Sequence, residues 1–290
     1  MLVVSAIITG LGLGAMYGLL ALGFHITYVV SNTVNFSQGS SMMLGAVLGY
    51  TFAFTLGWPM PLAILASLAL CGVFGLVVEL LLVRPFVARG SDAWLMATVA
   101  GGIVLDNVVL FTFGKEPRGF ASPLADKAIN VFGVGAYPLQ LIIPVVGIVA
   151  AGVLSYVLGH TRYGKAMSAV MQRPEAARLM GINTRFVVAG AFAVSTILAG
   201  VAGLLIAPLF NVSSGMGLVF GIKAFATAIL GGITSAWGVV LAGLLYGLVE
   251  ALTTAFLGSS YTQIIAFSMI IFVLFLMPNG LLGSPAVKKV

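Results

Sequence analysis

No Asp, Glu, Lys or Arg precedes Glu79, and long runs without charge recur through the rest of the chain. Over all 290 residues 61% are hydrophobic and 7% are charged, against roughly 25% charged residues in soluble domains. An apolar run of about 20 residues can cross roughly 30 Å of hydrocarbon as a helix. The alternating pattern of a membrane β-barrel is missing from the sequence, so these runs must satisfy their backbone hydrogen bonds as helices. The sequence therefore predicts an all-α integral membrane protein.

Hydropathy and helix breakers predict a polytopic bundle of about eight spans, which we interpret as a single transmembrane domain over residues 1–290. The predicted spans are 5–30, 36–57, 61–83, 94–114, 139–159, 186–208, 235–257 and 261–282. The first apolar run has no basic segment before it, so we interpret it as a span and not as a cleaved signal.

Basic residues between the spans predict which ends of the spans face the cytoplasm. Three groups guide the assignment: Arg84 with Arg89, the loop 160–185, and Lys288 with Lys289. Three further basic residues between spans, Lys115, Arg118 and Lys127, are partly balanced by Glu116 and Asp126. Two spans separate the first two groups, so both groups can be cytoplasmic. The sequence then predicts an external loop at 115–138, an external N-terminus and a cytoplasmic C-terminus.

The C-terminal third of the chain must fold back once if all three basic groups are to face the same side. Residues 219–257 form an apolar stretch much longer than one crossing requires, and Gly231 and Gly232 interrupt it. We predict a re-entrant or half-helix at 219–231, followed by a helix at 235–257. Non-helical backbone at membrane depth is tolerated where it is buried in protein or lines a cavity.

The sequence contains no convincing catalytic or metal site. Residues Gly159–Lys165 resemble the start of a phosphate-binding P-loop, but Ala166 stands where a Ser or Thr would hold Mg²⁺. His25 and His160 are far apart and have no acidic cluster nearby, and Cys71 lies in an apolar stretch. Basic residues beside spans do not form a nucleic-acid-binding face. We predict no catalytic residue, no metal, no cofactor bound by this chain and no nucleic-acid partner; the chain is not expected to be an enzyme.

Polar side chains inside spans are costly, so they mark a transport pathway or a buried structural pair. Our candidate pathway residues, polar or aromatic, are Asn35, Phe36, Gln38, Asn107, Lys223 and Phe225. Two alternatives stay open. The polar cluster at 31–38 is either a loop at the membrane surface or a helix break inside the bundle. Lys223 with Glu250 or Asp106 is either a neutralising ion pair or part of the pathway.

Glycines spaced four residues apart favour close packing of helices. They occur at Gly10, Gly14 and Gly18 in the first span, and at Gly243 and Gly247 in the seventh. The pattern is compatible with packing inside the chain or at an interface with another subunit.

The basic loop 160–185 contains a short predicted helix with exposed apolar residues. Pro174 suits the first turn, Glu175 lies near the positive end of the helix, and Gly181 ends it. A short apolar helix flanked by arginines fits a groove in a soluble partner. The alternative is an amphipathic turn that lies on the lipid surface.

Six segments together carry a resemblance to a known family. They are Val34–Gly39, Ala176–Asn183, Lys223–Phe225, Ile229–Ile233, Glu250–Leu252 and Met277–Gly283. In these segments, and over nearly its whole length, the chain is similar to permeases of branched-chain amino acid ABC importers, in the first of their two paired branches. It departs from the usual pattern at Gln38, where a His is often found, and at Trp237, where many relatives carry a Pro.

The resemblance implies the larger importer permease fold, used for vitamin B12 and iron chelates, in a bacterial inner membrane. It also implies four kinds of partner: a second homologous permease, two cytoplasmic ATPase subunits that hold ATP and Mg²⁺, a periplasmic substrate-binding protein and membrane lipid. The helix at 175–183 would be the coupling helix. The implied ATPase-coupling residues are Arg173, Glu175, Ala176, Ala177, Arg178, Leu179, Gly181, Ile182 and Asn183.

The implied function is import of leucine, isoleucine, valine or a related small solute, with urea, short amides and aromatic acids as open alternatives. A stand-alone secondary transporter or channel is a second reading of the same spans. The sequence has no clear pair of matched halves and few intramembrane titratable groups, which argues against that reading.

Overall fold

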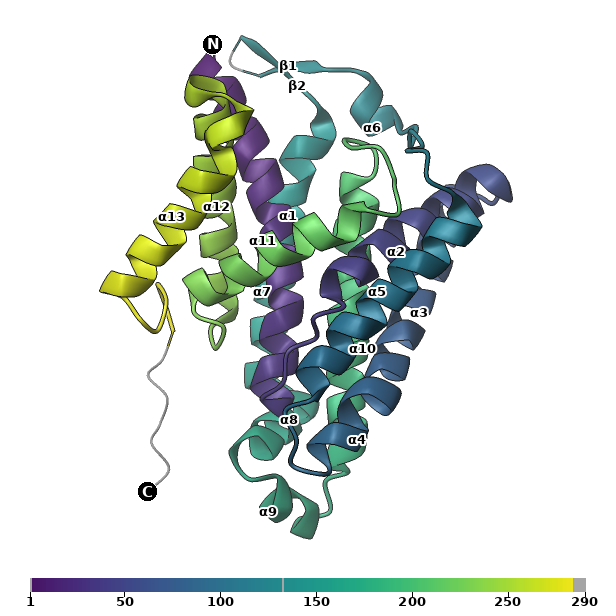
Figure 1. Ribbon diagram of the computed structural model, residues 1–290, viewed down its shortest axis with the longest axis vertical. Helices are drawn as coiled ribbons and strands as arrows, with labels where there is room; N and C mark the ends of the chain where they lie inside the picture. The colour runs from purple at the N-terminus through teal and green to yellow at the C-terminus, as the bar shows by residue number, and fades with distance from the viewer. Residues whose placement is uncertain (1, 132, 284–290) are drawn as a thin grey trace. The chain divides into compact units, whose positions relative to one another are not determined.

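A computed structural model of the chain describes residues 2–131 and 133–283, most of which are helical (Figure 1). Seven helical segments are long and apolar enough to cross a membrane. They are α1 (Leu2–Ser31), the segment Met60–Val87, α5 (Trp94–Phe113), α7 (Pro138–His160), α10 (Thr184–Ile206), α12 (Ala236–Leu257) and α13 (Ser259–Leu276). Each overlaps one predicted span, which confirms the prediction of a helical membrane bundle.

The second of these segments combines three elements: α3 (Met60–Val77), the π-helical η2 (Val78–Val83) and α4 (Arg84–Val87). The remaining predicted span, 36–57, is shorter than expected. α2 (Gln38–Tyr50) continues directly into the π-helical η1 (Thr51–Thr55), and the run ends before Gly57, whose φ is +67°. The estimate of about eight spans therefore corresponds to seven long helices and this shorter run.

The predicted half-helix is present as α11 (Met216–Gly231), an apolar helix of 16 residues. Gly232 follows it with φ +85° and separates it from α12. The end of α11 is held by the C-terminal part of the chain, because the Leu281 amide donates to the Leu230 carbonyl at 2.9 Å. The two glycines identified in the sequence thus mark the end of a real helix.

The loops contain small elements of their own. The predicted external loop holds α6 (Pro123–Asp126) and a hairpin of β1 (Ile129–Val131) with β2 (Val134–Ala136), which an all-α prediction did not include. In the hairpin Ile129 pairs with Ala136 and Val131 with Val134. The basic loop holds α8 (Arg162–Gln172) and α9 (Pro174–Leu179).

The chain divides into two compact units. Unit 1 comprises residues 1–25, 123–155 and 223–290, and unit 2 comprises residues 26–122 and 156–222. α1, α7 and α11 each contribute residues to both units. The single domain predicted over the whole chain stays a prediction.

Unit 1 is built on close contact between α1 and α12. A Cβ atom placed on Gly14 would lie 2.5 Å from the Gly243 carbonyl oxygen and 2.8 Å from the Leu244 Cα. Gly10 faces Gly247 in the same way, with 2.9 Å from such a Cβ to the Gly247 carbonyl oxygen. The glycine spacing seen in the sequence therefore serves packing within the chain.

Unit 2 is built on α10, which packs against α2 and α3. A Cβ on Gly45 of α2 would lie 2.5 Å from the Gly200 Cα of α10, and one on Gly200 would lie 2.9 Å from the Cys71 Sγ of α3. Cys71 is buried, as expected for a small core side chain. Phe192 of α10 is also fully buried and belongs to the apolar core of this unit.

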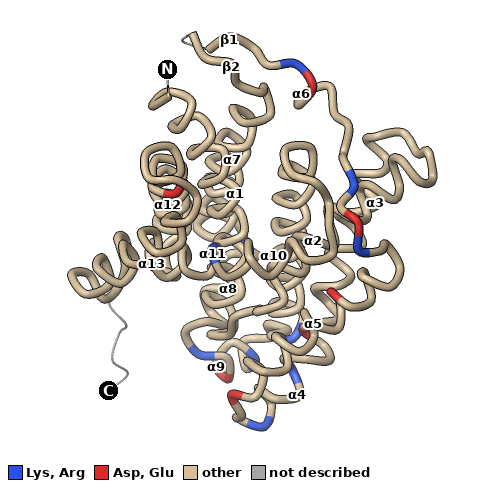
Figure 2. Tube along the Cα trace, turned by 45° about the horizontal axis from the view of Figure 1, so that its top comes forward, with Lys and Arg blue, Asp and Glu red and all other residues tan. Residues whose placement is uncertain are grey.

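Most charged residues of unit 2 lie at or beyond the ends of its helices (Figure 2), and Asp106 within α5 is an exception. α4, α8 and α9 lie at one end (Figures 1 and 2), so the basic groups at 84–89 and 160–185 share one side of this unit, as the charge pattern predicted. There Arg84 forms a two-pronged ion pair with Glu79, with Nε–Oε1 at 3.0 Å and Nη2–Oε2 at 2.6 Å. The third basic group, Lys288 and Lys289, lies outside the described residues.

Gly14→Ala is expected to destabilise unit 1, because the added methyl group would overlap the backbone of α12. Overpacking of this kind costs about 1–3 kcal/mol of the free energy of unfolding. Gly159→Ala in α7 is the matched control, since a Cβ there meets nothing within 4 Å. Thermal unfolding of the two purified variants in detergent measures the stability of each. Equal unfolding temperatures for the two variants would contradict the packing described here.

Candidate functional site

The polar cluster at 31–38 is a helix break inside unit 2. α1 ends at Ser31, Asn32 adopts φ +54°, and α2 begins at Gln38. Asn35, Ser37 and Gln38 are fully buried, at 0% exposure. Of the two alternatives that the sequence left open, the structure favours the interior break over a surface loop.

The broken backbone finds its hydrogen bonds locally. The Asn35 Oδ1 accepts from the Ser37 amide at 3.1 Å and from the Ser37 hydroxyl at 2.6 Å. The Phe36 amide donates to the Thr98 hydroxyl of α5 at 3.3 Å. The Asn35 Nδ2 is buried and has no hydrogen-bond partner among the described residues.

Gln38 links the start of α2 to α10. Its Nε2 donates to the Ser195 carbonyl at 2.9 Å, and the Ser195 hydroxyl donates back to the Gln38 Oε1 at 3.0 Å. Both residues are fully buried. Sequence reasoning did not single out Ser195, because 157 positions separate it from Gln38.

α5 passes close to the start of α2. A Cβ on Gly102 would lie 3.0 Å from the Ser40 hydroxyl. One turn further on, the Asp106 Oδ1 is buried and has no hydrogen-bond partner among the described residues. Asn107 is exposed, and its amide donates to the carbonyl of Ile103 in its own helix at 2.8 Å. Asn107 therefore does not join the buried cluster formed by Asn35 and Gln38.

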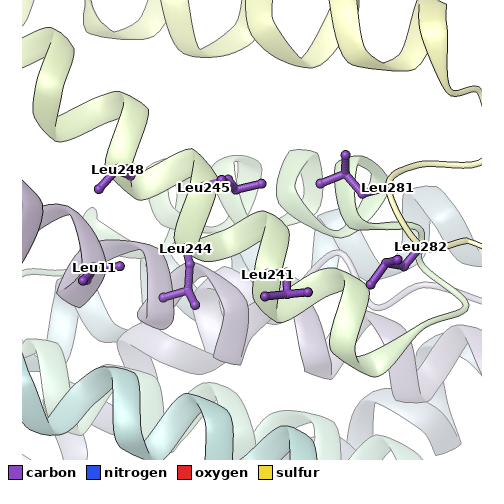
Figure 3. A pocket seen from close by; sticks show the side chains of 7 residues that line it. All are labelled: Leu11, Leu241, Leu244, Leu245, Leu248, Leu281 and Leu282. Atoms are coloured by element: carbon purple, nitrogen blue, oxygen red, sulfur yellow. The ribbon is translucent and has the colours of Figure 1, made fainter.

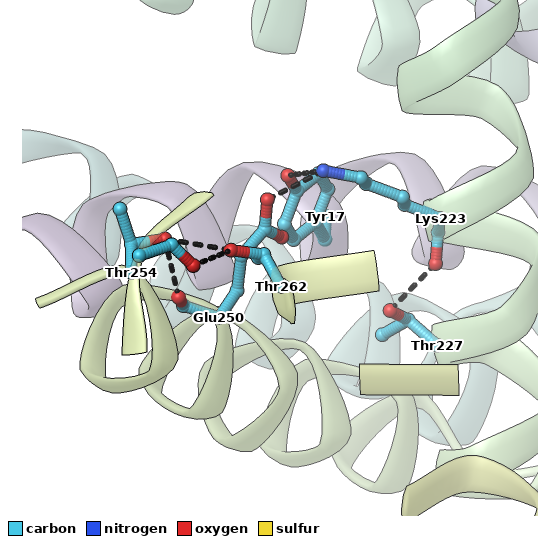
Figure 4. Close-up of polar contacts among 7 residues, drawn as sticks. Tyr17, Lys223, Thr227, Glu250, Thr254 and Thr262 are labelled. Atoms are coloured by element: carbon cyan, nitrogen blue, oxygen red, sulfur yellow. Dashed lines mark hydrogen bonds and ion pairs between the residues drawn. The ribbon is translucent and has the colours of Figure 1, made fainter. Parts of the chain in front are cut away.

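Two further pathway candidates, Lys223 and Phe225, lie on α11 in unit 1. The Lys223 Nζ contacts the Glu250 Oε1 at 2.5 Å and the Tyr17 hydroxyl at 3.3 Å (Figure 4). Phe225 packs edge-on against Phe24, with ring centroids 5.5 Å apart. The structure thus pairs Lys223 with Glu250; Asp106 belongs to unit 2 and takes no part in this pair.

The basic loop presents an exposed apolar tip. Thr161 caps α8 by accepting from the Gly164 amide at 3.0 Å, and Pro174 opens α9. In α9 and the residue after it, Leu179 is 89% exposed and Met180 is 83% exposed, whereas Ala177 is buried. Arg173, Glu175, Ala176 and Arg178, all predicted for coupling, are exposed as well.

The helix predicted at 175–183 as the coupling helix is shorter than expected. It ends at Leu179, and Gly181 turns the chain with φ +82°. Asn183 instead begins the next span, because its Oδ1 accepts from the Phe186 amide and caps α10. The prediction placed the end of α9 and the N-cap of α10 in one helix, because both lie in one short run of polar and small residues.

The P-loop-like segment does not form a phosphate loop. Gly159 and His160 end α7, and the Thr161 cap starts α8 immediately afterwards. Within residues 2–131 and 133–283 no three His, Cys, Asp or Glu side chains come together to form a metal site.

Unit 1 also has an apolar pocket of about 430 Å³. Its walls are leucines of α1, α12 and the C-terminal segment: Leu11, Leu241, Leu244, Leu245, Leu248, Leu281 and Leu282 (Figure 3). Leucine side chains can pack against a hydrocarbon group, but they offer no hydrogen-bond or ionic partner to the charged ends of an amino acid.

Comparison with known proteins places these features in a family. A family profile described as "Branched-chain amino acid transport system / permease component" matches residues 6–274. This chain belongs to that permease family. The chain is 30% identical to the high-affinity branched-chain amino acid transport system permease protein LivH of Escherichia coli K12, over 97% of this chain and 96% of LivH. It is also 30% identical to BraD of Pseudomonas aeruginosa, over 98% and 97% of the two chains.

A structural comparison finds PsaBC from Streptococcus pneumoniae, solved in complex with Fab, with a TM-score of 0.48 and 14% identity over 93% of this chain and 91% of that one. Two of the segments that carried the resemblance make buried or backbone contacts in this chain. Val34–Gly39 forms the buried break, and Met277–Gly283 closes on the end of α11, where the Leu282 amide donates to the Gly231 carbonyl at 3.2 Å.

Gln38→Leu is expected to destabilise unit 2 by about 2 kcal/mol, because it removes two buried hydrogen bonds with Ser195. Thermal unfolding in detergent checks this. Gln172→Leu, at an exposed position at the end of α8, is the matched control. The double variant Gln38→Leu with Ser195→Ala should recover part of the loss, and additive effects of the two changes would argue against a direct pair.

Proposed function

We propose that this chain is the membrane-spanning permease subunit of an ATP-driven importer for branched-chain or related amino acids. Membership of the permease family supports the general role, and the exposed apolar tip of α9 supports coupling to a partner. ATP hydrolysis then belongs to two cytoplasmic ATPase subunits, and this chain performs no covalent chemistry and binds no cofactor.

The coupling proposal depends on Leu179 and Met180. Large apolar side chains that are almost fully exposed beside charged residues are unfavourable in water unless a partner covers them. α9 begins at Pro174, and the Arg178 Nε donates to the Thr184 hydroxyl at the start of α10 at 2.9 Å, so movement of the tip would be passed to α10. A groove on the ATPase would receive this tip.

The remaining partners follow from the proposed role. A second, homologous permease would complete the pathway, and a periplasmic binding protein would deliver the solute. The chain would lie in a bacterial inner membrane with its N-terminus in the periplasm and its C-terminus in the cytoplasm. Asn35, Phe36, Gln38, Asn107, Lys223 and Phe225 remain our candidates for the pathway.

Reconstitution tests the proposed function. The chain is purified with the subunits that accompany it and placed in lipid vesicles with the binding protein outside, and uptake of radiolabelled L-leucine is measured with and without ATP. We expect uptake that requires ATP and the ATPase subunits. Uptake that continues without ATP would show a stand-alone transporter and would refute the proposal.

Leu179→Ser with Met180→Ser is expected to reduce ATP-driven uptake by more than about tenfold, because loss of two desolvated apolar contacts costs more than 1.4 kcal/mol of docking energy. The unfolding temperature should not change, since both side chains are exposed. Met171→Ser on α8, also an exposed apolar position, is the control. Wild-type uptake and ATPase association in the double variant would rule out this docking site.

A further inference from the structure

The apolar helices of unit 1 contain one opposite-charge pair. Among α1, α7, α11, α12 and α13, the Asp, Glu, Lys and Arg residues are Lys223 and Glu250 alone. Their side chains are 11% and 12% exposed. Burying charge in a membrane helix is costly, and such residues mark either a structural pair or the path of a solute.

Two tyrosines complete the surroundings of this pair. The Lys223 Nζ lies 5.6 Å from the centre of the Tyr17 ring as well as within hydrogen-bond distance of the Tyr17 hydroxyl. The Tyr246 ring meets the Tyr17 ring edge-on at 5.5 Å. Tyr246 and Glu250 are four positions apart on α12, so their side chains share one face of that helix.

The cluster has hydrogen-bonding capacity to spare. The Lys223 Nζ uses one carboxylate oxygen of Glu250; the other, Oε2, is buried and has no hydrogen-bond partner among the described residues. The Tyr246 hydroxyl is buried and likewise unpartnered within residues 2–131 and 133–283. If the ion pair had a purely structural role, an unused acceptor and an unused donor beside it would add nothing to the stability of the fold.

We propose that Glu250, Tyr246 and Lys223 form a binding site for the zwitterionic backbone of an α-amino acid. The ammonium group of the amino acid donates to the free Glu250 Oε2. Its carboxylate accepts from the Tyr246 hydroxyl and interacts with the positive charge of Lys223. This inference rests on the proposed function, whose solute carries both charges. Ion pair and zwitterion are each neutral overall, so binding adds no net charge to the membrane interior.

Tyr246→Phe separates a binding role from a structural one. Removing an unpartnered buried hydroxyl leaves no partner unsatisfied, so a purely structural cluster should keep or raise its unfolding temperature and transport normally. A binding site loses one hydrogen bond to a charged group. We therefore expect an unchanged or higher unfolding temperature together with L-leucine uptake about tenfold lower at subsaturating concentration.

A second variant tests the charges. Lys223→Met with Glu250→Gln removes both charges while keeping similar volumes, so neither group is left as an isolated buried charge. We expect this variant to fold and to lose uptake by more than about tenfold. Thr254→Val is the matched control; its hydroxyl bonds to the Glu250 carbonyl and to Thr262 in the same cluster but belongs to no proposed contact (Figure 4).

Direct binding provides a readout that does not depend on transport. Millimolar L-leucine should raise the unfolding temperature of the purified wild-type chain, whereas 3-methylbutylamine, which lacks the carboxylate, and 4-methylpentanoate, which lacks the ammonium group, should not. Wild-type uptake in Tyr246→Phe, or equal effects of the three compounds on the wild-type chain, would overturn the site. Should wild-type vesicles show no ATP-dependent uptake, the proposed function fails, and the binding measurement alone decides whether the site exists.

Discussion

Close contact between helix backbones at glycine residues determines how each unit of this permease is built. Lipid is as apolar as a leucine side chain, so helices in a membrane gain little from hydrophobic burial and associate through tight packing instead. In unit 1 the Gly14–Gly243 contact brings α1 against α12. The same approach sets Tyr17 edge-on to Tyr246, and the charged pair lies beside them. In unit 2 the Gly45–Gly200 contact joins α2 to α10 and so positions Gln38 near Ser195.

Interrupted helices are the second feature that organises the structure. A break in a membrane helix exposes backbone groups that must find partners inside the protein. After α1 these partners are side chains, with Thr98 accepting from the Phe36 amide and Asn35 from the Ser37 amide. After α11 they are backbone groups of the C-terminal segment at 281–282. The break after α1 also places the polar side chains of Asn35, Ser37 and Gln38 inside unit 2.

Charged residues of this permease occur in two different settings. In unit 2 the exposed charged residues Arg173, Glu175 and Arg178 lie in the same short segment as the exposed apolar tip formed by Leu179 and Met180. In the helices of unit 1 one lysine and one glutamate are held against each other. The first setting suits a cytoplasmic partner that must dock and release. The second suits a small solute that carries opposite charges of its own.

The sequence by itself determined the membrane class, the approximate spans, the short helix ending at Gly231 and the exposed loop around α9, because hydropathy, glycine and proline act over a few neighbouring residues. It did not decide which acidic residue pairs with Lys223, that Asn107 stays apart from Asn35, or that Asn183 caps α10 and lies outside the α9 helix. It also gave no signal for Tyr246 or Ser195. Tertiary structure decided these points, since Gln38 and Ser195 are 157 positions apart and Lys223 and Glu250 are 27 apart. Such pairs are set by which helix faces meet, and the spacing of glycines within one helix does not specify which other helix it packs against.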